Sequence, residues 1–271
     1  MLKQIPNFFT LLNLIFGCIA IVFVLQTGET IARLDESTVM YWVLPENIGI
    51  GALFLFAAAV VDFLDGFLAR LLKASSGMGE QLDSLSDMVS FGVAPGMILY
   101  QLLRMSYTKE ENGLEVTMLA LLPAFLFTAA VAWRLAKFNI STTQKYHFEG
   151  VPSPAGGLLI ASLPLALHYD NDTVRELIVN RWFLYGVILL VSYLMVSHHP
   201  MMALKFRDYS FRNNKPKFLL VAVSIVAILL LGWLAVPVIF AVYVLLSFFL
   251  KEPPAPAAAQ ATSREEKDIT V

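Results

Sequence analysis

The stretch Val61-Asp-Phe-Leu-Asp-Gly-Phe-Leu-Ala-Arg70 places two carboxylates and an arginine at the end of a long apolar run. Its acids, Asp62 and Asp65, stand three residues apart, and a second pair, Asp83 and Asp87, stands four apart where another apolar run begins. On helices, both spacings put the two acids on one face. Ionisable groups are costly at membrane depth, so this acidic cluster indicates a functional site that the rest of the chain supports.

The composition predicts an all-α integral membrane protein. Hydrophobic residues make up 58% of the chain, charged residues only 15%, and the mean hydropathy is +0.69, whereas a soluble domain is nearer half apolar and a quarter charged. The chain contains no basic domain that would indicate a nucleic-acid partner. The one cysteine, Cys18, excludes an intrachain disulfide framework, and we expect it to be a small packing residue. No cleavable signal peptide is expected, because the first apolar run continues for about a full span.

Eight apolar runs predict a bundle of about eight transmembrane helices. The runs cover residues 8–25, 48–68, 82–103, 117–136, 154–168, 182–196, 218–234 and 236–250. The last two meet at Gly232-Trp-Leu-Ala-Val-Pro237, which is typical of a tight turn between antiparallel helices. One kinked segment is the alternative there, and it would reduce the count to seven.

The basic residues predict the orientation. With the amino terminus inside, 14 of the 19 Lys and Arg residues fall in cytoplasmic segments, so both termini and the 70–79 connection are expected to face the cytoplasm. Residues 1–250 then form one transmembrane domain. The Pro/Ala-rich and charged segment 251–271 cannot bury a core and is expected to be a disordered cytoplasmic tail.

The acidic cluster predicts a divalent-cation site. Clustered carboxylates repel one another unless a proton or a cation lies between them. Carboxylate oxygens without His or Cys favour Mg²⁺, Mn²⁺ or Ca²⁺ over zinc, and four Asp residues can hold two ions. Gly66 and Gly79 allow close approach of a nucleotide, and Arg70 can grip a phosphate, so the substrate is expected to be a diphosphate. Helix-to-helix salt bridges are the alternative, but adjacent apolar segments hold too few basic residues to pair every acid.

Thr10 and Asn13 share one face of the first expected helix with Gly17. Small and polar residues on one face are common where membrane helices pack together. They are equally expected to line a polar pocket, and on that reading Thr10 and Asn13 contribute to nucleotide binding.

The acidic stretch resembles the CDP-alcohol phosphotransferase signature at every defining position, over Asp62-x2-Asp65-Gly66-x2-Ala69-Arg70-x8-Gly79-x3-Asp83-x3-Asp87. The surrounding sequence is similar to the phosphatidylserine synthase subgroup of bacteria and archaea. The segments that carry this similarity are Ile5-Pro-Asn, Asp87-Met-Val-Ser-Phe-Gly-Val-Ala-Pro95, Arg134-Leu-Ala-Lys-Phe-Asn139 and Phe148-Glu-Gly-Val-Pro-Ser-Pro-Ala155. The resemblance extends over about residues 5 to 220.

The resemblance implies a dimeric helix bundle in the inner or plasma membrane of a prokaryotic cell, with a polar cavity facing the cytoplasm. It implies transfer of a phosphatidyl group from CDP-diacylglycerol to the hydroxyl of L-serine, with release of CMP. Asp62, Asp65, Asp83 and Asp87 would surround the metal ions. Asp83 and Asp87 would be catalytic, with Asp87 as the base for the incoming hydroxyl. The CDP moiety would be bordered by Gly66, Ala69, Arg70 and Gly79.

Serine also needs partners for its carboxylate and ammonium groups, and the segment from Arg134 to Gly157 carries several cations. The subgroup resemblance favours Arg134 and Asn139, and Ser153 is expected to be a polar contact or a helix cap. Ordinary positive-inside loop charge is the competing interpretation of these cations.

Three other functions stay open from the sequence. The first is the same chemistry with glycerol 3-phosphate or an inositol phosphate as acceptor, which would need a further cation cluster near Asp87. The second is a membrane prenyltransferase, which the frame of Gly66, Arg70 and Gly79 disfavours. The third is a cation transporter whose acids line an ion path.

Overall fold

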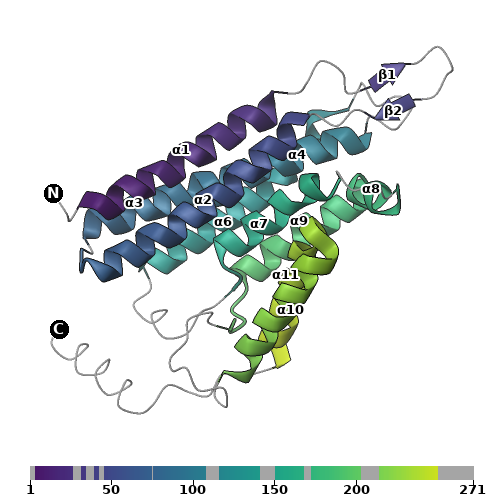
Figure 1. Ribbon diagram of the computed structural model, residues 1–271. Helices are drawn as coiled ribbons and strands as arrows, with labels where there is room; N and C mark the ends of the chain where they lie inside the picture. The colour runs from purple at the N-terminus through teal and green to yellow at the C-terminus, as the bar shows by residue number, and fades with distance from the viewer. Residues whose placement is uncertain are drawn as a thin grey trace.

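The computed structural model describes residues 4–26, 32–34, 40–42, 46–74, 76–107, 116–140, 150–167, 172–202 and 214–249, and it is almost entirely helical there (Figure 1). The expected tail at 251–271 lies outside these residues. In chain order the helices are α1 (Ile5–Leu25), α2 (Glu46–Leu71), α3 (Gly77–Asp87), η2 (Met88–Val93), α4 (Ala94–Tyr107), α5 (Met118–Leu121), α6 (Ala124–Ile140), α7 (Ser153–Ala166), α8 (Asp172–Ile178), α9 (Arg181–Val196), α10 (Lys215–Leu231), η4 (Gly232–Leu234) and α11 (Ala235–Phe249). Two short antiparallel strands, β1 (Ala32–Leu34) and β2 (Met40–Trp42), connect α1 to α2.

Each of the eight apolar runs overlaps a helix, but the described helices differ in length. Four stretches are long and apolar enough to cross a membrane, namely Ile5–Leu25, Asn47–Leu71, Gly77–Tyr107 and Lys215–Phe249. A fifth is obtained if α8 and α9, which meet at an angle of 61°, are counted together. Helix α7 is apolar but has only 14 residues. The helical membrane architecture is therefore confirmed, while eight separate crossings remain a prediction.

Close approach of α1 to its neighbours depends on residues without large side chains. Pro6 lies in the first turn of α1, where its missing N–H costs no helical hydrogen bond. A Cβ at Gly17 would meet the backbone of Ser90 at 2.9 Å, and a Cβ at Gly51 of α2 would meet the Ala20 carbonyl oxygen at 2.8 Å. Hence α1 can lie directly against both α2 and η2, as small residues allow in membrane bundles.

The core of the bundle is apolar and closely packed. Its largest fully buried side chains include Phe91 of η2, Phe127 of α6 and Ile160 of α7. Large apolar side chains also face outward, among them Val22, Leu230 and Phe249, as expected for helices surrounded by lipid rather than water.

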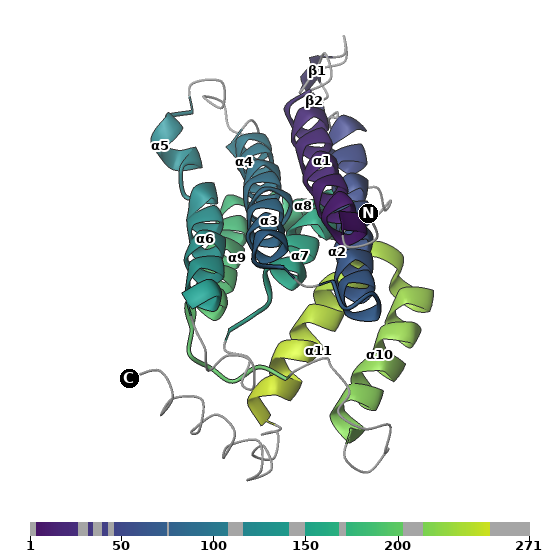
Figure 2. The same cartoon turned by 90° about the vertical axis from the view of Figure 1, so that its left-hand side faces the viewer.

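The two ends of the bundle differ. The start of α1, the end of α2, the start of α3 and the end of α6 gather at one end, and the strands β1 and β2 lie at the other (Figures 1 and 2). We call the first of these the site end, because the acidic residues of α2 and α3 lie toward it. The basic residues Arg70, Arg134 and Lys137 all lie in the carboxyl-terminal halves of their helices, α2 and α6.

The turn expected near residue 232 is present. Gly232 ends α10 with a φ of 52°, a conformation that side-chain-bearing residues rarely adopt. Helices α10 and α11 contact one another and form a V beside the rest of the bundle (Figure 2).

Candidate active site

Helix α3 presents the second pair of acids because its first turn is capped. The Ser76 hydroxyl accepts a hydrogen bond of 3.0 Å from the Gly79 N–H, which satisfies one of the open donors at the helix start. The helix then runs without a break through η2 into α4. Asp83 and Asp87 are one turn apart on this continuous rod, and both lie beside α2.

The acids of the two helices converge. Carboxylate oxygens of Asp62, Asp83 and Asp87 all lie within 4.8 Å of one another. Three negative charges at this spacing repel one another, and Asp62 and Asp87 are partly withdrawn from the water that would screen them, whereas Asp83 is exposed. The arrangement is therefore favourable only with positive charge between the carboxylates.

Asp65 is next to this group but does not share its centre. Asp65 as a residue is 5% exposed, and its carboxylate interacts electrostatically with Asp62 and Asp83 and lies near the Thr10 hydroxyl. Within the described part of the chain, Asp65 Oδ2 and Asp87 Oδ1 are buried without a hydrogen-bond partner. Buried oxygens without a donor, beside three convergent carboxylates, fit a hard divalent cation such as Mg²⁺ or Mn²⁺.

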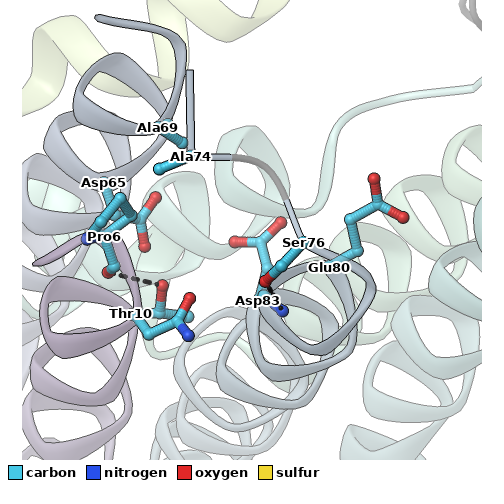
Figure 3. A pocket seen from close by; sticks show the side chains of 11 residues that line it. Pro6, Thr10, Asp65, Ala69, Ala74, Ser76, Glu80 and Asp83 are labelled. Carbon is cyan, nitrogen blue, oxygen red and sulfur yellow. Dashed lines mark hydrogen bonds between the residues drawn. The ribbon is translucent and has the colours of Figure 1, made fainter. Parts of the chain in front are cut away.

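A pocket opens between α1, α2 and α3 next to the acids (Figure 3). Asp65 and Asp83 point into it from opposite sides, while the Glu80 carboxylate is directed away. The residues that line it are Pro6, Asn7, Thr10, Asp65, Gly66, Ala69, Ala74, Ser76, Gly79, Glu80 and Asp83. Of the residues expected to border a nucleotide, Thr10, Gly66, Ala69 and Gly79 are thus brought to one surface.

Two other expected nucleotide contacts do not line this pocket. Arg70 is exposed in the last turn of α2, at the site end. Asn13 is fully buried one turn deeper than Thr10, and within the described residues neither atom of its side-chain amide has a hydrogen-bond partner.

The three residues expected to recognise serine lie beside the acidic helix. Arg134 Nη1 donates a 2.7 Å hydrogen bond to the Ser153 hydroxyl, and its guanidinium interacts electrostatically with Asp87. Asn139, one turn further along α6, accepts a 3.0 Å hydrogen bond from Ser84 of α3. Arg134 and Ser153 therefore form one polar contact near Asp87, and Asn139 lies closer to the end of α6.

Two serines that hold the acidic helix against α1 were not expected from the sequence. Ser86 and Ser90 donate hydrogen bonds of 3.0 Å to the main-chain oxygens of Thr10 and Asn13. Their four-residue spacing within an apolar run is a signal that could have identified them. The π-helical turn η2, which begins directly after Asp87, carries no comparable signal, although such turns are frequent at functional sites.

The comparisons with known proteins agree with the acidic signature. The family model described as CDP-alcohol phosphatidyltransferase matches residues 3–197. Over 160 residues the chain is 36% identical to the CDP-diacylglycerol–serine O-phosphatidyltransferase of Bacillus subtilis (strain 168), covering 57% of this chain and 75% of that one. It is 37% identical to the protein of the same name from Mycobacterium leprae (strain TN) over 153 residues, 54% of this chain and 46% of that one.

An archaeal relative is also similar. The chain is 41% identical over 106 residues to the CDP-diacylglycerol–serine O-phosphatidyltransferase of Methanocaldococcus jannaschii, which covers 39% of this chain and 46% of that one. The matched segment thus spans about half the length of the mycobacterial and archaeal relatives.

Asp83→Asn should weaken Mn²⁺ binding at least about tenfold, because a neutral amide replaces one of the convergent charged oxygens. Titration of the purified protein with Mn²⁺, followed by electron paramagnetic resonance, measures the change. Without metal, the variant should unfold at the same or a higher temperature, since one repelling charge is removed. Glu80→Gln is the matched control on the same helix, and unchanged Mn²⁺ affinity in Asp83→Asn would contradict the metal site.

Gly66→Ala should lower the affinity for CDP, measured calorimetrically with Mg²⁺ present, by about tenfold or more, because the added methyl enters the pocket. A Cβ at Gly66 meets no atom within 4 Å, and the same holds at Gly186 of α9, which lies outside the pocket. Gly186→Ala is therefore the matched control. Both variants should be at least as stable as the parent, since Ala favours a helix over Gly. Equal CDP affinity in the two variants would show that Gly66 does not face the nucleotide.

Proposed function

Because the chain belongs to the CDP-alcohol phosphatidyltransferase family, we propose that it transfers a phosphatidyl group from CDP-diacylglycerol to L-serine, giving phosphatidylserine and CMP. The observation that carries this proposal is the convergence of Asp62, Asp83 and Asp87 beside a pocket lined by Gly66, Ala69 and Gly79. The names of the bacterial and archaeal relatives support serine as the acceptor.

The proposed cofactor is Mg²⁺ or Mn²⁺, with Ca²⁺ as a further candidate and two ions in the site. Asp62, Asp83 and Asp87 would hold the first ion, and Asp65, which faces Asp83 across the pocket, would contribute to the second. Bound cations would neutralise the charge that develops on the diphosphate as CMP leaves.

The remaining chemistry falls to the protein's own side chains. The serine hydroxyl oxygen attacks the phosphorus that carries the diacylglycerol, and the bond from that phosphorus to the CMP oxygen breaks. A carboxylate within hydrogen-bond reach must take the hydroxyl proton, and Asp87, on the Arg134 side of the cluster, is the proposed base.

The acceptor pocket is proposed at Arg134, Ser153 and Asn139. A guanidinium presents its donors in a fixed fork that matches a carboxylate. The 2.7 Å bond to Ser153 sets the orientation of that fork, and its electrostatic interaction with Asp87 puts it near the proposed base. A serine bound through its carboxylate at Arg134 would direct its hydroxyl toward Asp87. Arg70, exposed at the site end, would meet the nucleotide from solvent, and Asn13 would support the pocket from behind.

The proposed setting is the inner or plasma membrane of a prokaryotic cell, with eight transmembrane helices, both termini and the active site on the cytoplasmic side. The bias of Lys and Arg toward the site end supports this orientation. The acyl chains would then stay in lipid while nucleotide and serine approach from water. Residues 1–250 would be the catalytic domain and 251–271 a tail. A homodimer, implied by the family resemblance, should be detected by native mass spectrometry in detergent.

Purified protein incubated with CDP-diacylglycerol, Mn²⁺ and labelled L-serine should yield labelled lipid and CMP in equal amounts. Chromatography of the lipid and nucleotide fractions measures both products. Parallel reactions with glycerol 3-phosphate and an inositol phosphate test the alternative acceptors. If lipid product forms with one of these alcohols but not with serine, that alcohol is the acceptor in place of serine. If CMP is released with none of the three, the chain is not a transferase of this kind.

Single cysteines introduced in a Cys18→Ser background should report the orientation. A membrane-impermeant maleimide should label position 36, between the strands, in intact cells, and should label positions 73 and 260 only after the membrane is opened. Labelling of position 73 from outside would reverse the proposed orientation. Labelling of positions 36 and 260 from the same side of the membrane would mean an even number of crossings between them, and would contradict eight crossings.

A further inference from the structure

The carboxyl-terminal hairpin α10–α11 lies beyond residue 197, where the family match ends, yet α11 is not simply a lipid-facing helix. It packs against α7. Its buried residues are Ala235, Tyr243 and Ser247, whereas α10 exposes most of its length. Two of these three buried side chains are polar, so their hydrogen-bond partners indicate what the hairpin holds.

Both polar side chains bind the same residue. The Tyr243 hydroxyl donates a 3.3 Å hydrogen bond to the Met202 carbonyl oxygen, and the Met202 N–H donates one of 3.1 Å to the Ser247 hydroxyl. Met202 is itself buried and belongs to the segment that follows α9. Helix α11 therefore holds both the main-chain N–H and the carbonyl oxygen of Met202 in place.

The end of α9 and the segment after it in turn fix the residues just before α7. The His199 carbonyl oxygen accepts a 3.0 Å hydrogen bond from the Gly150 N–H, and the Leu194 carbonyl oxygen accepts one of 3.1 Å from the Val151 N–H. Gly150 has a φ of 74°, and a Cβ there would collide with the Met195 carbonyl oxygen, so the two segments are in close contact. Two residues after Val151 comes Ser153, the acceptor for Arg134.

The hairpin also contributes to the electrostatic surroundings of Arg134. The Arg134 guanidinium interacts electrostatically with Asp87, at the end of α3, and with Tyr243 of α11. Tyr243 is 5% exposed, and in this apolar surrounding a dipole near a cation acts more strongly than it would in water. The Tyr243 hydroxyl thus holds the segment after α9, which is bonded to the residues just before Ser153, and it also belongs to the surroundings of Arg134.

We propose that the α10–α11 hairpin is the specificity element of the acceptor pocket, and that Tyr243 positions Arg134 to receive the carboxylate of a small hydroxy amino acid. This inference rests on the proposed function for the identity of the acceptor. Tyr243 acts through Arg134 and Ser153, so it is a positioning residue. Nucleotide and metal, which bind between α1, α2 and α3, are unaffected by it.

Tyr243→Phe tests the proposal, since it removes the hydroxyl and keeps the ring. The KM for L-serine should rise about fivefold, the loss expected for one hydrogen bond, while the KM for CDP-diacylglycerol and the Mn²⁺ affinity stay within about twofold. Tyr185→Phe is the matched control, because Tyr185 also donates to a main-chain oxygen, that of Ala120, at 2.7 Å. Tyr185 contacts Tyr107 of α4 and lies away from the acceptor residues.

Ser247→Ala is the second variant, and it decides the outcome if Tyr243→Phe does not fold. It cuts the bond to the Met202 N–H and should also raise the serine KM selectively. The proposal is overturned if the folded variants keep the parental serine KM, or if the KM values for serine and CDP-diacylglycerol rise together. It is also overturned if Tyr185→Phe raises the serine KM as much as Tyr243→Phe does. Should the parent protein use another alcohol in place of serine, the acceptor assignment fails. The KM for that alcohol in the same variants then decides the role of the hairpin by the same criteria.

Discussion

The repulsion between carboxylates in a largely apolar bundle is the constraint on which the rest of the structure depends. Three of them, on Asp62, Asp83 and Asp87, lie within 4.8 Å of one another. Asp62 and Asp87 are only partly exposed to water, so a cation or a proton between the carboxylates stabilises the group. The helices that carry the acids therefore have to be held at fixed positions, because a small displacement would separate the ligands of the cation.

Several weak interactions together supply that rigidity. Ser86 and Ser90 tie α3 and η2 to the main chain of α1, and Gly17 permits the approach. On the other side, Thr128 of α6 donates a 3.0 Å hydrogen bond to the Gly92 carbonyl oxygen, inside the π-helical turn. The turn that follows Asp87 is thus bound on two faces. The site depends on these contacts as much as on the acids themselves, since pre-organised ligands bind a cation with less rearrangement.

The sequence was sufficient for the helical membrane class, for the acidic cluster and for most of the pocket lining, because charge in an apolar run and a fixed spacing are local signals. It also named Arg134 and Ser153 as candidate serine contacts, but not the hydrogen bond between them. It could not supply Tyr243, since that residue reaches Arg134 through the packing of α11, and nothing near it in the chain distinguishes it from other tyrosines. The π-helical turn likewise carries no periodic signal, whereas the short length of α7 matches the short apolar run at 154–168. The sequence also did not show that Asn13 lies deeper than the pocket lining. Residue spacing predicts which residues share a helix face, but not how far a pocket extends along that face.

Anomalous X-ray scattering from crystals of the full chain grown with Mn²⁺ tests the central claim most directly. The account predicts an anomalous peak between α2 and α3, at roughly 2.0–2.6 Å from carboxylate oxygens of Asp62, Asp83 and Asp87. Strong peaks elsewhere and none between these three residues, in protein that needs Mn²⁺ for turnover, would contradict it.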